Sequence, residues 1–195
     1  PRLTMLGRLV AFLVVGFARA VTGVRAEWHA LPAEGPRIYY ANHASHGDFV
    51  LVLASLPPPL RATARPVAGA DYWCAGRLRR FFGETVFRAV LIDRVPRRGG
   101  PDPIDAMAAA LDAGAALIVF PEGTRNLGEE PLQPLKSGLH HLACRRPEIE
   151  LVPVWIDNLN RVLPKGEFVP VPLLCTVTFG PPLRLAPAEP RADFL

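Results

Sequence analysis

The sequence predicts an α/β fold: a single domain with a largely parallel central sheet flanked by helices, together with a membrane-associating helical segment at the N-terminus. Short apolar runs alternate with segments of helical periodicity, the pattern of a parallel sheet with crossover helices. At 195 residues the chain has the length of one domain, and it contains no internal repeat or low-complexity linker. Two polar motifs each follow a predicted strand, at the sheet edge where open α/β folds bind ligands.

The N-terminal segment contains an unbroken apolar run from Leu9 to Ala18, between Arg8 and Arg19. This run is shorter than the roughly 20 apolar residues that a helix needs to span a bilayer. The spacing of the two arginines places them on nearly the same face of a helix. We therefore predict a helix over residues 3–24 in the membrane interface, with its arginines toward headgroups and these apolar side chains toward acyl chains: Phe12, Leu13 and Phe17.

Two further interpretations of this segment stay open. An ordinary core helix would show the same periodicity. The small residues around Arg19 also resemble the cleavage site of a signal peptide. We assign residues 1–28 to the N-terminal segment and residues 29–195 to the main domain.

The first half of the main domain is predicted to contain three strands and two helices. A buried strand covers residues 37–41, and a helix over 48–55 ends before the prolines at 57–59. A strand is expected over 62–68. A basic amphipathic helix over 75–82 precedes a strand over 86–93, which ends beside Arg94.

The second half is predicted to contain two helices and three strands. Asp102 followed by Pro103 is a good helix start, and Gly114 marks that helix's end near residue 112. The remaining elements are a strand over 115–120, a helix over 136–145, and strands over 151–156 and 173–179.

Composition and charge restrict the class of partner. Half of the residues are apolar, the formal net charge is +4, and the pI is about 9.4. No dense basic run is interleaved with aromatic residues, so these values suit an anionic membrane surface better than a nucleic acid. The three cysteines form no CxxC pair, which argues against a disulfide framework or a cysteine zinc site and favours a reducing, cytosolic setting.

The motif Asn42-His43-Ala44-Ser45-His46-Gly47-Asp48 follows the strand over 37–41. His43 can accept a proton near neutral pH, and Asp48 can orient its ring. The spacing of His43, His46 and Asp48 also resembles a set of metal ligands, and His140 with His141 offers further imidazoles.

The motif Phe120-Pro121-Glu122-Gly123-Thr124-Arg125 follows the strand over 115–120. It combines a glycine turn with a carboxylate, a hydroxyl and a guanidinium, and a guanidinium can hold a phosphate through two parallel hydrogen bonds. Together the two motifs indicate proton abstraction from a hydroxyl beside a bound anionic group.

These motifs make the chain resemble the glycerophospholipid acyltransferases. Residues 42–48 match the first block of that family, NHxSxxD, and residues 120–126 match the third. Residues 90–94 resemble the second block, although Ala89 stands where glycine is usual, and residues 152–154 resemble the fourth. All four blocks occur in the family's order.

The resemblance implies acyl transfer from acyl-CoA or acyl carrier protein to a lysophospholipid hydroxyl, 1-acyl-glycerol-3-phosphate first among the acceptors. It implies that His43 is the general base and Asp48 its partner, without a cofactor or metal. The substrate-binding residues would be Arg94, Glu122, Gly123, Thr124 and Arg125. It also implies a peripheral or monotopic protein at the cytoplasmic face of the inner membrane.

One difference from the family pattern leaves the identity of the acceptor lipid open. Many relatives carry a basic residue in the stretch that corresponds to residues 66–72, whereas this chain has none there. A lyso-lipid with a different headgroup is therefore a second candidate acceptor. Two rival functions are a metal-dependent phosphoester hydrolase and a lipid-binding module without catalysis.

Overall fold

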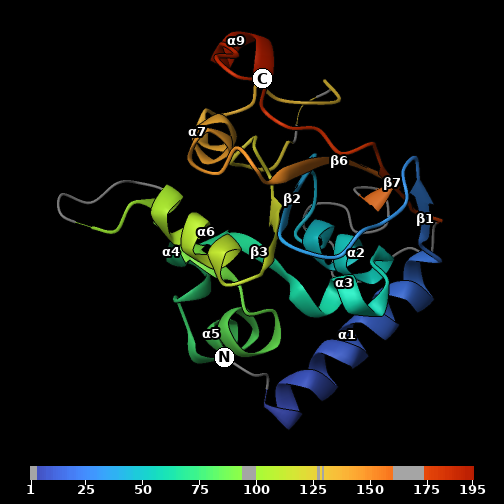
Figure 1. Cartoon of the computed structure of the whole chain (residues 1–195). Coiled ribbons are helices and arrows are strands. Elements are labelled where there is room, and N and C mark those ends of the chain that lie inside the picture. The colour runs from blue at the N-terminus through green and yellow to red at the C-terminus, as the bar shows by residue number, and fades with distance from the viewer. Residues whose placement is uncertain (1–3, 94–99, 127, 129, 160–173) are drawn as a thin grey trace.

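The computed structural model describes residues 4–93, 100–126, 128, 130–159 and 174–195. Within them, the strands form one sheet in the order β1-β7-β6-β2-β5-β3-β4 (Figure 1). The strands are β1 Arg25–Trp28, β2 Arg37–Ala41, β3 Ala64–Gly69, β4 Val90–Ile92, β5 Ala116–Val119, β6 Glu150–Asp157 and β7 Thr176–Phe179. The helices are α1 Met5–Thr22, α2 Asp48–Ser55, α3 Pro58–Thr63, α4 Ala70–Trp73, α5 Arg77–Arg80, the π-helix η1 Phe81–Val86, α6 Pro103–Asp112, α7 Gly138–Arg145 and α9 Arg191–Phe194.

The sheet confirms the predicted fold class. Every described pair of neighbouring strands is parallel except β6 and β7. The strands β6, β2, β5, β3 and β4 therefore run in one direction, and their carboxyl ends share one edge. β1 and β7 run the opposite way.

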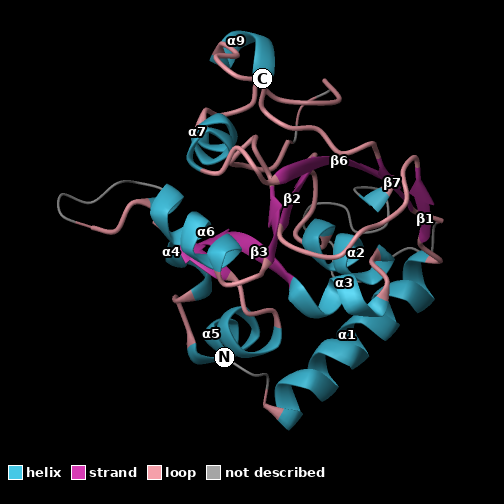
Figure 2. Ribbon diagram, in the orientation of Figure 1, coloured by secondary structure: helices cyan, strands magenta, loops and turns pink. Residues whose placement is uncertain are grey.

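Helices cover both faces of the sheet, and the alternation of side chains along β2 shows why. Tyr39 and Ala41 point into a buried cluster with α1, α2 and η1, whereas Ile38 points into a second cluster with α6 and α7. In Figure 2, α6 and α7 lie to the left of β2 and α1, α2 and α3 lie to its right.

The helix α1 forms close to where it was predicted. The Thr4 side chain accepts a hydrogen bond from the Gly7 amide at 3.1 Å, and the helix ends at Gly23 in the left-handed conformation. It is long and apolar enough to cross a membrane, which the ten-residue run had not predicted. One of its faces packs on α2 and η1, and the other exposes large apolar side chains: Met5, Leu6, Leu9, Phe12, Leu13 and Phe17.

Arg19 does not lie where the sequence suggested. Its Nε and Nη2 atoms donate to the carbonyl oxygen of Ala54 at 2.8 and 2.6 Å. Ala54 is in the last turn of α2, where carbonyl groups lack helical partners and carry partial negative charge. Arg19 therefore ties α1 to α2 instead of turning toward lipid headgroups.

Among the elements that differ from the sequence prediction are α3, β4 and β1. α3 begins at Pro58, inside the expected proline loop, because a proline in the first turn of a helix loses no hydrogen bond. β4 is shorter than expected, because the helix that begins at Arg77 continues as η1 to Val86 and Arg88 then takes a left-handed φ of 51°. β1 was not predicted, and it places residues 25–28 of the assigned N-terminal segment in the sheet.

Candidate active site

The two polar motifs meet at the carboxyl edge of the sheet. β2 ends two residues before His43 and β5 ends three residues before Glu122, and these two strands are neighbours. The backbone amide of His43 donates to Glu122 Oε1 at 2.6 Å. Segments 79 residues apart in the sequence are therefore in direct contact.

His43 and Asp48 make the predicted contact. His43 Nδ1 lies 2.8 Å from Asp48 Oδ2, and the same oxygen accepts the amides of Ala44 and Ser45 at 2.7 and 2.8 Å. Asp48 is the first residue of α2, where the helix dipole favours a carboxylate, and its side chain is only 1% exposed. A carboxylate can only accept, so Nδ1 carries the hydrogen and Nε2 is left as a proton acceptor.

The His43 ring is held from its face as well as its edge. The Phe120 ring stacks on it with 4.3 Å between centroids and 21° between planes. The imidazole is one-fifth exposed, so it is fixed in orientation and still open to a substrate.

Asn42 anchors the start of this loop. Its side chain donates to the carbonyl oxygen of Ile156 at 3.0 Å and accepts from the Ile156 amide at 2.7 Å. These two bonds reach β6, the other neighbour of β2. Sequence reasoning gave Asn42 no role, because the pairing of β2 with β6 has no local signature.

Glu122 occupies a position unlike the one its motif suggested. Its side chain is buried, and while Oε1 accepts from His43, Oε2 accepts the amide of Gln133 at 3.0 Å. Both carboxylate oxygens are thus committed to backbone amides. In the structure, Glu122 holds the His43 loop in place through these bonds. Direct contact between Glu122 and a lysophospholipid stays a prediction, and neither carboxylate oxygen is free to support it.

Gly123 takes the left-handed φ of 69° that its turn requires. A Cβ atom here would lie 2.8 to 2.9 Å from three side-chain atoms of Lys136, Nζ among them. Lys136 therefore covers the glycine turn and adds a cation to it.

A cavity of about 230 Å³ joins the two motifs. His43 and Phe120 line it together with Thr124 and Arg125, and it lies at the ends of β2, β5 and β3. We call it the Arg125 cavity. The predicted proximity of His43 to the arginine turn is therefore present.

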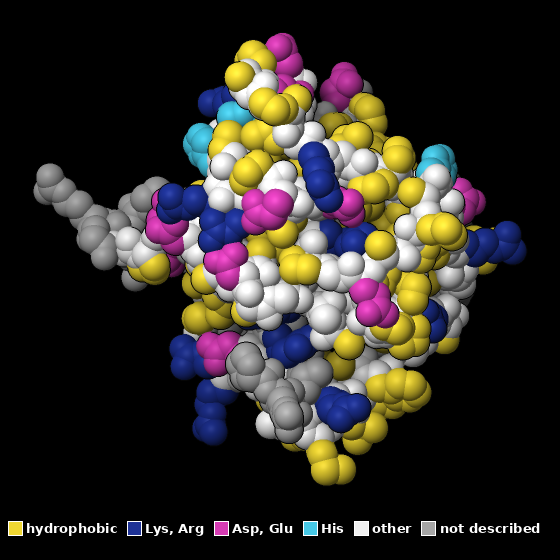
Figure 3. All heavy atoms as spheres, in the orientation of Figure 1, with side chains coloured by type: hydrophobic (Ala, Val, Ile, Leu, Met, Phe, Trp, Pro, Cys, Tyr) yellow, Lys and Arg dark blue, Asp and Glu magenta, His cyan; other side chains and the backbone are white. Residues whose placement is uncertain are grey.

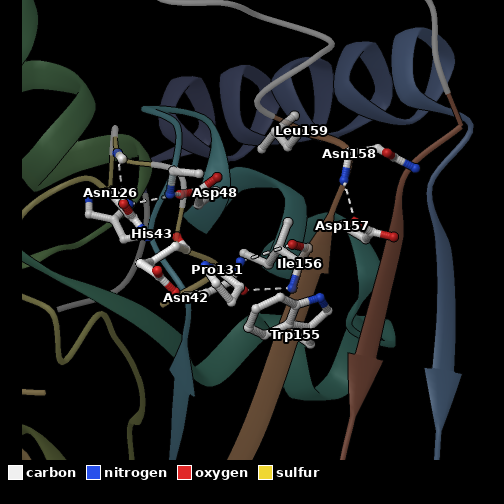
Figure 4. A pocket seen from close by; sticks show the side chains of 13 residues that line it. Asn42, His43, Asp48, Asn126, Pro131, Trp155, Ile156, Asp157, Asn158 and Leu159 are labelled. Atoms are coloured by element: carbon white, nitrogen blue, oxygen red, sulfur yellow. Dashed lines mark hydrogen bonds and ion pairs between the residues drawn. The ribbon is translucent and has the colours of Figure 1, made fainter. Parts of the chain in front are cut away.

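A second cavity of about 190 Å³ opens on the other side of His43. Figure 4 shows its wall, with His43 and Asp48 at one end and Asn42 bonded to Ile156 below them. Trp155, which is 43% exposed, also lines it. His43 thus lines both cavities.

His46 lies at the mouth of the Arg125 cavity. Its ring stacks on Tyr72 with 5.6 Å between centroids, and the Arg79 guanidinium lies 4.4 Å from the centre of that ring. Burial lowers the pKa of His46, and Arg125 and His43 lower it further. This stack could not be predicted from the sequence. It places Arg79 beside Tyr72, at the end of the stretch 66–72 in which this chain has no basic residue.

Arg94 lies outside the described residues, so its assignment stays a prediction. Among the described residues, no group of three or more His, Cys, Asp and Glu side chains is arranged to hold a metal ion. His46 stacks on Tyr72, while His43 pairs with Asp48.

Comparison with known proteins adds a family and a fold. A family model described as Acyltransferase matches residues 24–157. The chain is 28% identical over 187 residues to a 1-acyl-sn-glycerol-3-phosphate acyltransferase of Limnanthes alba, with 92% of this chain and 62% of that protein covered. It is 27% identical over 145 residues to the Helicobacter pylori protein of that name, with 73% and 57% covered. The chain thus spans about three fifths of the length of these relatives.

A solved structure shows the same fold. The 1-acyl-sn-glycerophosphate acyltransferase of Thermotoga maritima superposes with a TM-score of 0.68 over 95% of this chain and 73% of that chain. The two sequences are 21% identical.

Proposed function

This chain belongs to the acyltransferase family, and we propose that it transfers a fatty acyl group from a thioester to the free hydroxyl of 1-acyl-sn-glycerol-3-phosphate. The observation that carries the proposal is the shared cavity of His43 and Arg125, a proton acceptor beside an anion-binding side chain. The donor would be acyl-CoA or acyl carrier protein, with no cofactor. The names of the curated relatives support the same acceptor.

His43 acts as the general base in this proposal. Nε2 takes the proton of the acceptor hydroxyl as its oxygen attacks the thioester carbonyl carbon. The tetrahedral intermediate collapses with cleavage of the carbon–sulfur bond, and the imidazolium returns the proton to the leaving thiolate. Asp48 keeps Nδ1 protonated and stabilises the imidazolium, since it is fixed by three hydrogen bonds.

The acceptor phosphate would bind in the Arg125 cavity. Arg125 and the Thr124 hydroxyl line it, and Lys136 covers the adjoining turn. Gly123 leaves room for the Lys136 side chain at this turn, and Arg94 is proposed as a further cation. Glu122 contributes by holding the His43 amide.

The exposed face of α1 supports a membrane-bound position. Its apolar side chains are more than half exposed, a patch that soluble monomers seldom leave open to water. We propose that this face enters the cytoplasmic leaflet of the inner membrane and that acyl chains reach the site from there.

Thiol release during incubation with acyl-CoA and a panel of lysolipids tests the function. We expect release only with a lysolipid, and fastest with 1-acyl-sn-glycerol-3-phosphate. His43→Ala should lower kcat by about 10²–10⁴-fold, whereas His141→Ala, on the exposed surface of α7, should not. Arg125→Gln should raise the KM of the phosphate acceptor more than that of the donor.

Three outcomes would count against this assignment. Full activity of His43→Ala would show that His43 is not the general base. A faster reaction with a lysolipid that lacks the phosphate monoester would select a different headgroup. Phosphate release that stops in EDTA would favour the metal-dependent hydrolase.

A further inference from the structure

A third cavity lies at the opposite edge of the sheet from His43. It has a volume of about 290 Å³ and is bounded by α1, α3 and the chain from Val86 to Arg88. It shares no lining residue with the Arg125 cavity or the cavity beside Asn42. Its walls reach the start of β3 at Ala64 and the last turn of α2 at Leu53, so it belongs to the amino edge of the parallel strands.

The cavity combines an apolar wall with three guanidinium groups. Ala11, Phe12 and Phe87 contribute to the wall, and Arg8, Arg61 and Arg88 line the same space. In the described parts of the chain, none of the three arginines forms an ion pair with a carboxylate. Arginines that line one cavity without acidic partners leave positive charge and N–H donors there that an anion can bind.

Much of the hydrogen-bonding capacity of these arginines is unused. Arg61 donates from Nε and Nη2 to the carbonyl oxygens of Leu53 and Leu56, both at 2.7 Å, and Arg88 donates from Nη2 to the carbonyl oxygen of Ala62. Arg61 Nη1 and Arg88 Nε and Nη1 have no partner among the described residues, and Arg8 makes no side-chain bond there. Each guanidinium can therefore still donate to a ligand.

The surroundings of these groups are short of negative charge. Burial lowers the pKa of Arg61, with Arg19 adding to the effect, and burial lowers the pKa of Arg88, with Arg65 adding to it. Both directions express the cost of holding a guanidinium group away from water with a second arginine nearby. A bound anion would offset that cost.

The position of the cavity favours a ligand that has both an anionic group and an apolar chain over a free anion. Phe12 is a wall of the cavity and, at 72% exposed, also part of the apolar face of α1. Figure 3 shows hydrophobic side chains along the lower right edge of the molecule, over α1, with Lys and Arg side chains beside them. An acyl chain can thus continue from the cavity along α1. About 290 Å³ is at the small end for ligand pockets, enough for a headgroup and the start of its chains.

We propose that this cavity binds one anionic phospholipid of the membrane, with its phosphate against Arg8, Arg61 and Arg88 and its acyl chains along α1. The site does not use His43, Arg125 or any other residue of the proposed reaction. It would add recognition of anionic headgroups to the apolar insertion of α1.

The test uses short-chain phosphatidylglycerol, held below its micelle concentration, and measures binding by calorimetry. We expect one lipid per chain for the unaltered protein. Arg8→Gln should weaken binding about tenfold, because it removes a charged contact and Arg8 makes no described side-chain bond that the fold would lose. Ala62→Trp keeps every arginine, and its ring should block the cavity from the exposed surface of α3 and abolish binding.

Matched controls separate this site from surface charge and from the active site. Arg191→Gln makes the same change of charge in α9 and should leave binding unchanged. Arg125→Gln should also leave it unchanged, so a failure of the proposed reaction and a failure of this site are distinguishable. Thermal unfolding of each variant verifies that it is folded.

Several results would overturn the proposal. One is equal binding by the unaltered protein and Ala62→Trp. Another is loss of binding in Arg125→Gln, which would assign the lipid to the Arg125 cavity. A third is inorganic phosphate binding as tightly as the lipid, which would mean that the apolar wall contributes nothing.

Discussion

The Glu122 carboxylate links two loops that follow neighbouring strands, and it does so without access to solvent. A glutamine in its place has one acceptor oxygen, so its amide group would face either the His43 or the Gln133 amide. We expect Glu122→Gln to lower the free energy of unfolding by about 1–3 kcal/mol and to lower kcat through displacement of His43. Urea unfolding and steady-state kinetics measure the two effects. Glu27→Gln, on exposed β1, is the control, and equal effects of both changes would contradict the role of Glu122.

The role of the turn at Gly123 can be tested by substituting Gly123, with Gly114 as the matched control. Both have a left-handed φ, 69° and 82°, so alanine at either position should cost about 1–2 kcal/mol of stability. Only at position 123 would the new methyl group meet Lys136, since nothing lies within 4 Å of a Cβ at position 114. We therefore expect Gly123→Ala alone to raise the acceptor KM. If both variants have a similar acceptor KM, the glycine turn at position 123 takes no part in acceptor binding.

His46 gives the protein a dependence on pH. Its folded pKa is lowered, so between that value and the ordinary 6.5 the unfolded chain binds more protons than the folded one. The free energy of unfolding therefore falls as the pH falls through this window and is fully regained above 6.5. His46→Asn should lose less thermal stability than the unaltered protein between about pH 7.5 and about pH 5.5. His141→Asn is the control, and identical losses in all three proteins would show that His46 is not responsible.

The sequence identified the residues of the site whose partners are close in the chain. His43 and Asp48 are five residues apart and separated by the strand-to-helix turn, so their contact follows from local structure. The hydrogen bonds of Glu122 and of Asn42 depend on which strands are neighbours of β2. Periodicity carries no information on that order, and these two roles became visible only in the structure.

The close approach between α1 and η1 depends on a glycine. A Cβ at Gly7 would lie 2.8 Å from the backbone oxygen of Thr85, which has no freedom to turn away. Gly7→Ala should push α1 from η1 and lower the free energy of unfolding by about 1–3 kcal/mol. Gly16→Ala in the same helix has open space and should stabilise by about 0.5–1 kcal/mol. Thermal unfolding compares them, and the same sign for both would refute the close contact.

The elements that were predicted well are those with a strong period or a clear boundary. α2 and β2 have the predicted bounds, and α6 begins where Asp102 accepts the Ile104 amide at 2.8 Å. The region from Arg77 to Ala89 was predicted less well. A π-helix has no distinct hydrophobic period, and its continuation past residue 82 depends on packing against α1 and not on local propensity.

The outer face of α1 should decide the affinity of the protein for membranes. Leu13 and Phe17 are 58% and 63% exposed and do not line the cavity of Arg8. Replacing both with glutamine should weaken binding to phospholipid vesicles at least about tenfold, since each side chain loses about 1.5–3 kcal/mol of burial in lipid. The same change at Leu31 and Leu183, 94% and 50% exposed, is the control. Vesicle flotation that fails to separate the two double variants would place the membrane contact elsewhere.

The His43 loop is fastened to both neighbours of β2, by Asn42 to β6 and through Glu122 to the loop after β5. β6 lies far along the sequence from β2, and the Asn42 bonds to it span 114 residues. During synthesis on the ribosome, the imidazole is therefore held in place only after β6 has emerged and the middle of the sheet has closed. A nascent or partly unfolded copy lacks that arrangement, and if the proposed function holds, it has no positioned base with which to promote attack on a thioester.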